Sequence, residues 1–122
     1  MERLMFVMKL HQGQIEEYES RHEAVWPELL GDLWNAGWRN YSLFRRGHEI
    51  FAYAECHPCV ADALGAMRHS KSNQDWAEWF STVIASISDS DGNLFQADEV
   101  WHMNDQIAEK SAHVNSADPS DR

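Results

Sequence analysis

A histidine and a tyrosine occupy positions of one predicted helix where apolar residues are expected. Tyr18 and His22 are four residues apart and are therefore neighbours on one helical face. An imidazole beside a phenol at such positions indicates either an acid–base site or a hydrogen-bonded histidine of the core. The apolar residues of the same face are spaced mostly by threes and fours: Ile15, Val25, Trp26, Leu29 and Leu33.

Two further aromatic residues can complete a site of this kind. Trp76 begins the apolar face of a later predicted helix, and the first turn of a helix often lies at the rim of a domain. Tyr41 lies on a predicted strand. With Tyr18 and His22, these residues would supply an aromatic surface, hydroxyl groups and a proton donor. Such a set suits a small polyol, since flat aromatic surfaces also bind the faces of sugars.

The cysteines and histidines do not indicate a metal or redox centre. Cys56 and Cys59 form a C-x-x-C pair before a predicted helix, whose N-terminus could acidify a thiol. However, the predicted element order is not thioredoxin-like, and no second C-x-x-C completes a zinc site. The seven His have neither H-x-x-x-H nor H-E-x-x-H spacing. We therefore expect no metal and no other cofactor.

The composition disfavours several classes of binding partner. The net charge is −10, with 20 acidic against 10 basic residues, which disfavours nucleic acid and anionic membranes. No apolar run approaches the roughly 20 residues of a membrane span, and residues 1–10 are too short for a signal peptide. We expect a cytoplasmic protein with a neutral or weakly polar ligand.

The first half of the chain predicts a strand, a broken helix and a hairpin. Residues 1–10 alternate with apolar residues on both faces, which is typical of a central strand. A helix follows to about residue 36 and should bend or restart near Trp26, because Pro27 lacks an N–H donor. Residues 39–46 and 49–56 are β-rich and flank Gly47-His48, the spacing of a two-residue hairpin.

The second half predicts two helices and a last strand. A short helix opens at Pro58, a longer one covers residues 75–88, and residues 94–103 alternate as a strand. The order β-α-β-β-α-β is the ferredoxin-like α+β arrangement in a single domain over residues 1–104. The polar residues 105–122 are expected to form a disordered tail. The apolar strands need cover on the helix-free face, so we expect a homodimer, with two sheets packed together or sharing a barrel.

Several short motifs resemble the L-rhamnose mutarotase family. They occur in the family's order, and the similarity covers about residues 3–103. The segment from Arg21-His22 to the Trp-Pro-Glu-Leu stretch is the most specific part. The motifs are Phe6-Val7-Met8, Tyr18 with Arg21-His22, Trp26-Pro27-Glu28-Leu29, Asn40-Tyr41, and Gln74 with Trp76.

This resemblance implies a ferredoxin-like α/β barrel, assembled as a homodimer, that interconverts the α and β anomers of L-rhamnose without a cofactor. It implies that His22 is the proton donor and that Tyr18, Tyr41 and Trp76 contact the sugar. One position departs from the family, which often carries a Trp-Trp pair where this chain has Trp76-Ala77. L-fucose or another deoxy sugar is therefore a second candidate substrate.

Two other functions fit the same residue pattern. Cofactor-independent monooxygenases share the dimeric ferredoxin-like fold, and that alternative predicts a larger apolar pocket and oxygen uptake. The second alternative is a non-catalytic dimer that binds a sugar or metabolite, in which His22 only donates a hydrogen bond.

Acid–base opening of a pyranose ring needs no nucleophile or metal, and an ordinary histidine pKa near 6.5 suits the proton donor.

Overall fold

The computed structural model describes residues 1–107 of the chain, so most of the tail predicted over 105–122 lies outside the described residues. Residues 103–107 are helical. The other elements are β1 (Glu2–Leu10), α1 (Ile15–Arg21), the 3₁₀ turn η1 (His22–Ala24), α2 (Pro27–Asn35), β2 (Trp38–Arg46), β3 (Glu49–Cys56), α3 (Val60–Arg68), α4 (Lys71–Trp79), β4 (Ile84–Ser86) and β5 (Gln96–Ala97).

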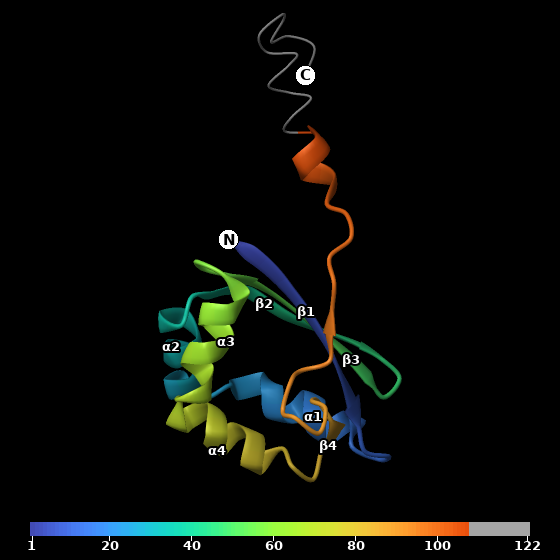
Figure 1. The fold of residues 1–122 in the computed structure, drawn as a ribbon. Coiled ribbons are helices and arrows are strands. Elements are labelled where there is room, and N and C mark those ends of the chain that lie inside the picture. The colour runs from blue at the N-terminus through green and yellow to red at the C-terminus, as the bar shows by residue number, and fades with distance from the viewer. Residues whose placement is uncertain (108–122) are drawn as a thin grey trace, which may run out of the picture.

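One antiparallel sheet organises the fold. Its order is β2-β3-β1-β4, and β5 also pairs with β1. The helices cover one face of this sheet (Figure 1). The central strands β1 and β3 turn their buried side chains toward the helices: Leu4, Phe6, Met8 and Leu10, with Ile50, Ala52, Ala54 and Cys56. The predicted α+β, ferredoxin-like fold is confirmed.

The first predicted helix is broken, as expected. Its first part ends at Arg21, a 3₁₀ turn carries His22, and Val25 and Trp26 are extended before α2 begins at Pro27. Proline is favoured in the first turn of a helix, where no intrahelical partner for its missing N–H is needed. The break therefore places His22 at the C-terminal end of a short helix.

A β-bulge interrupts the predicted hairpin. Arg39 pairs with Glu55 and Ser42 with Tyr53, so Asn40 and Tyr41 together face one residue of β3. Asn40 adopts a positive φ of 50°, which asparagine tolerates better than most residues, and its side chain donates to Glu55. A bulge shifts the alternation of a strand by one residue. Trp38, before the bulge, and Tyr41, within it, consequently line the same cavity.

The predicted helix over residues 75–88 is wrong at both ends. Helix α4 begins at Lys71 because the hydroxyl of Ser70 accepts the backbone N–H of Asn73, a capping contact that the apolar pattern does not reveal. It ends at Trp79, and Ile84–Ser86 forms strand β4 against the end of β1. Phe80 and Val83 are buried by the turn after α4 instead of by a continuing helix, whereas Ile87 is exposed. The short helix predicted from Pro58 is confirmed, with its first residue at Val60.

The predicted last strand over residues 94–103 is also largely wrong. Only Gln96–Ala97 is a strand, and it pairs with Met5 and Phe6 of β1. Strands β4 and β5 share one edge of β1, because β4 already pairs with Lys9 and Leu10. After β5 the chain runs away from the helices and past the body of the domain (Figure 1). This segment is anchored by Arg3, whose guanidinium pairs with Glu99.

The helix-free face of the sheet is apolar and partly exposed. Val7, Phe51 and Phe44 lie in one row across β1, β3 and β2, and Phe44 is 59% exposed. Beyond β5, Val100 and Trp101 are 93% and 61% exposed. None of the described helices is long and apolar enough to cross a membrane.

Candidate functional site

All four predicted site residues line one cavity of about 800 Å³. Its walls come from the helices, from the helix-covered face of β1 and β2, and from the segment over residues 84–96. Tyr18 and His22 enter from α1 and the turn after it, Tyr41 from the bulge in β2, and Trp76 from α4. The structure therefore brings together residues that are up to 58 positions apart in the sequence, from Tyr18 to Trp76.

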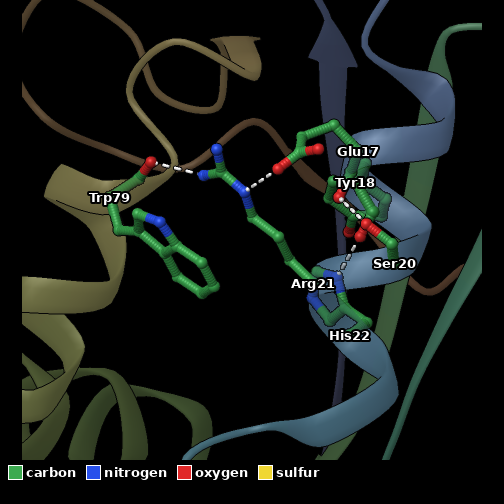
Figure 2. A network of polar contacts seen from close by, with 6 residues as sticks. All are labelled: Glu17, Tyr18, Ser20, Arg21, His22 and Trp79. Carbon is green, nitrogen blue, oxygen red and sulfur yellow. Dashed lines mark hydrogen bonds and ion pairs between the residues drawn. The ribbon is translucent and has the colours of Figure 1, made fainter.

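The Tyr18 and His22 rings are in contact one helical turn apart, tilted by 43° with centroids 4.5 Å apart. The His22 Nδ1 atom lies 2.8 Å from the Tyr18 backbone carbonyl oxygen (Figure 2). A carbonyl oxygen only accepts, so Nδ1 carries the proton of the neutral ring. Nε2 is then the nitrogen that takes up and releases a proton, which leaves it free to act on a ligand.

The environment of His22 disfavours its charged form. Burial lowers the pKa of the imidazole below its usual 6.5, and the hydrogen bond to the Tyr18 carbonyl offsets part of this effect. Imidazolium in this site is consequently a stronger acid than in water. Burial also raises the pKa of the Tyr18 phenol, and neighbouring Tyr41 adds to the shift. Burial raises the pKa of the Tyr41 phenol as well, so both phenols are neutral hydrogen-bonding groups near pH 7.

Trp76 contacts the imidazole directly. The two rings meet edge to face, with centroids 5.4 Å apart, and Trp76 also stacks on buried Phe80 at 4.8 Å. Its indole is partly exposed and lines the cavity beside Ala77. Trp79 does not take the place of an indole at position 77, since it is stacked on Trp26 and is not among the lining residues.

Polar residues that sequence reasoning missed also line the cavity. They include Asn73, Asn93 and Gln96, and two arginines, Arg39 and Arg68. No Asp or Glu of the described residues is among the lining side chains. Asn73 falls four residues before Ala77 and so on the same helical face, a spacing that an α4 beginning at Lys71 would have revealed. Arg39 lies in β2, Arg68 ends α3, and Asn93 and Gln96 lie in and after the loop that precedes β5, so no single periodic pattern links them.

The cysteine pair lies apart from this cavity. Cys56 is fully buried on the helix side of β3, and burial raises the pKa of its thiol, which makes it less reactive. Cys59 is half-buried, and neither thiol forms a disulfide. Among residues 1–107, no three His, Cys, Asp or Glu side chains are grouped so that they could hold a metal ion.

The chain matches the family model of L-rhamnose mutarotase over residues 3–103. An L-rhamnose mutarotase of Rhizobium meliloti is 49% identical over 103 residues, which are 84% of this chain and 99% of that protein. An L-rhamnose mutarotase of Oceanobacillus iheyensis is 30% identical over 105 residues, with 84% and 99% covered.

Two solved structures share the fold. The crystal structure of an L-rhamnose mutarotase from Formosa agariphila superposes with a TM-score of 0.69 at 26% identity, covering 84% of this chain and 99% of that one. A tetracenomycin F2 cyclase from Streptomyces glaucescens, a type-II polyketide cyclase, gives 0.58 at 16% identity, with 84% and 96% covered. At that identity the cyclase supports the fold alone.

Proposed function

The chain belongs to the L-rhamnose mutarotase family, and from this premise we propose that it interconverts the α and β anomers of L-rhamnose with His22 as the proton donor. One observation carries the residue assignment. The Nδ1 proton of His22 is held by the Tyr18 carbonyl at 2.8 Å, while the same ring contacts an aromatic wall of the cavity. A single imidazole is thereby fixed in orientation with one nitrogen left for chemistry.

Ring opening needs one proton delivered and one removed. As the C1–O5 bond of the pyranose breaks, Nε2–H of the His22 imidazolium gives its proton to O5, and the anomeric hydroxyl loses its proton to form the C1 carbonyl. Rotation about C1–C2 exposes the other carbonyl face. Closure reverses the transfers, with neutral Nε2 taking the proton back from the O5 hydroxyl. One positioned acid–base group typically contributes about 10²- to 10⁴-fold.

The base for the anomeric hydroxyl is assigned to solvent within the cavity. No carboxylate of the described residues lines the cavity, so none of them is available there as the base. The raised pKa of Tyr18 makes its phenol a poor base near pH 7. Tyr18 and Tyr41 instead act as hydrogen-bonding partners of the sugar hydroxyls.

Trp76 is proposed to bind the apolar face of the sugar ring. It is partly exposed to the cavity and is held against His22 and Phe80. A sugar stacked on this indole would have its ring atoms beside the imidazole. Stacking on a fixed ring also limits the orientations from which the proton is transferred.

The position of Ala77 leaves space beside Trp76. Ala77 is exposed and lines the cavity, and a methyl group fills much less of it than an indole. L-rhamnose is the first candidate, on the family membership, and L-fucose or another 6-deoxy sugar is the second. The two sugars differ in ring stereochemistry and share the C6 methyl group, so this wall is where selection between them is expected.

We infer that the active form is a homodimer. The apolar row of Val7, Phe51 and Phe44 on the helix-free face would be covered by a second copy of the chain. The exposed segment after β5, with Val100 and Trp101, is long enough to reach beyond its own domain (Figure 1). The cytoplasmic location stays a prediction of the sequence.

The experiment that tests the function is NMR saturation exchange between the anomers of L-rhamnose, with and without the protein. L-fucose and the 6-hydroxy counterpart of L-rhamnose complete the panel. Exchange accelerated for L-rhamnose supports the proposal, and preference for L-fucose would assign the second candidate. Binding without acceleration would identify a non-catalytic sugar-binding protein. Oxygen uptake with an aromatic polyketide, and no effect on any sugar, would favour the monooxygenase alternative.

A further inference from the structure

Arg21 joins the ends of two helices beside the candidate site. It is the last residue of α1, and its guanidinium lies between the Glu17 carboxylate and the backbone carbonyl of Trp79 (Figure 2). Nε donates to Glu17 at 2.8 Å, and Nη1 donates to the Trp79 oxygen at 2.6 Å. The Arg21 side chain is only 15% exposed, so this contact is shielded more than most surface ion pairs.

The backbone carbonyl oxygen of Trp79 is well placed to accept the hydrogen bond from Arg21. Trp79 is the last residue of α4, and the final carbonyls of a helix have no intrahelical donor and carry partial negative charge. A guanidinium satisfies such a carbonyl with a charge-assisted hydrogen bond. The Arg21 guanidinium carbon also lies 4.5 Å from the ring centroid of Trp79 and 5.2 Å from that of Phe80. Each distance is within the range of a cation–π contact.

A chain of aromatic contacts leads from Trp79 back to His22. Trp79 stacks on Trp26 with centroids 5.3 Å apart, and Trp26 meets Trp76 edge to face at 4.9 Å. Trp76 in turn contacts His22. Neither Trp26 nor Trp79 is a lining residue of the cavity, so both support its wall from behind.

We propose that Arg21 is a positioning residue for the reaction: by fastening the end of α1 to the end of α4, it sets the His22 imidazole against Trp76. Arg21 itself is not among the residues that line the cavity. The role rests on the proposed function, because it acts through the proton donor and the sugar-binding wall. Small displacements of such groups are costly, since a misplacement of about 1 Å can reduce a rate about a hundredfold.

The Glu17–Arg21 ion pair alone does not account for this role. It is an i, i+4 pair with a 48% exposed carboxylate, and exposed pairs of this kind contribute little to stability. Glu17→Gln should therefore leave the Trp79 contact and the reaction intact. Arg45 provides a matched control, because it pairs with Glu19 of the same helix at 3.0 Å but lies outside the site.

The test compares anomer exchange rates of the full-length protein with those of Arg21→Gln, Glu17→Gln and Arg45→Gln. We expect Arg21→Gln to lower the rate at saturating sugar about tenfold, while KM stays within about threefold. Glu17→Gln and Arg45→Gln should stay within about twofold of the original protein. If Arg21→Gln does not fold, Arg21→Lys replaces it, since lysine keeps the charge but not the planar fork.

A second readout needs no substrate. The ¹⁵N spectrum of the His22 ring should show one tautomer, protonated at Nδ1, in the original protein and exchange between tautomers in Arg21→Gln. An unchanged rate or an unchanged His22 spectrum in the folded variant would overturn the positioning role. An original protein that exchanges no anomers would instead overturn the proposed function, and the ¹⁵N comparison would still decide whether Arg21 positions His22.

Discussion

His22 and Trp76 meet edge to face, with ring centroids 5.4 Å apart, although they come from the ends of different helices. The proposed proton donor and the proposed sugar-binding surface are thus in direct contact. A sugar on the indole face would lie within reach of the imidazole, so sugar binding and proton transfer both depend on the contact between His22 and Trp76. Substitutions of these two residues should nevertheless have different kinetic effects, because stacking on Trp76 acts throughout the reaction and proton transfer from His22 only in the transition state.

Replacing His22 with alanine should slow anomer exchange by at least about a hundredfold, since the variant lacks the proton donor. The variant should fold, because His22 is only half-buried. NMR saturation exchange at saturating L-rhamnose measures the rate, and circular dichroism checks the fold. His11→Ala, which removes an exposed histidine at the turn after β1, is the control and should keep the full rate. Near-normal exchange in folded His22→Ala would exclude this mechanism.

The free energy of unfolding should depend on pH because the pKa of His22 is lowered in the folded protein. Above pH about 6.5 the ring is neutral in both the folded and the unfolded chain. As the pH falls through about 6.5, the unfolded chain takes up the proton first, so the folded protein loses stability until the lower folded pKa is passed. Urea unfolding from about pH 7.5 to about pH 5 should therefore show the original protein losing stability relative to His22→Gln. A constant difference would contradict the burial effect.

Trp76→Ala should raise KM for the sugar by at least about fivefold and change kcat less, because the indole face holds the ring in the ground state and the transition state alike. Trp76→Phe keeps an aromatic surface and should stay closer to the original KM. Loss of a fully buried Trp costs about 3–5 kcal/mol, and half-buried Trp76 should cost less. A collapsed melting temperature with normal KM would make Trp76 a packing residue alone.

Sedimentation equilibrium at micromolar concentration should give twice the chain mass of 14.1 kDa. Phe44→Asp should shift the protein to monomer, since it places a charge in the apolar row of the helix-free face. Ala61→Asp adds the same charge at an exposed position of α3 and should remain dimeric. A monomeric original protein would show that this face is covered in another way.

Dialysis against a strong chelator should leave the exchange rate unchanged, and so should a reductant. The His22 mechanism requires no metal, and the Cys56 thiol is buried with a raised pKa. The rate before and after treatment is measured on one preparation, with EDTA removed before the assay. Loss of exchange that one added metal restores would require a different mechanism.

Local rules of the chain predicted much of the fold. The spacing of Tyr18 and His22 places them on one helical face in any helix, and Pro27 restarts the helix because of its own missing N–H. The hairpin around Gly47-His48 and the alternating strands follow from short-range patterns in the same way. These features involve residues a few positions apart, so the sequence alone determined them.

The tertiary structure decided where distant segments compete or meet. The edge of β1 accepts both β4 and β5, which ends α4 at Trp79 and shortens the last strand to Gln96–Ala97, against the apolar pattern. The bulge at Asn40 that turns Tyr41 into the cavity depends on pairing with β3. The hydrogen bond from Arg21 to Trp79 spans 58 positions. Such contacts depend on backbone partners that no local period encodes, and they determine how the site is assembled.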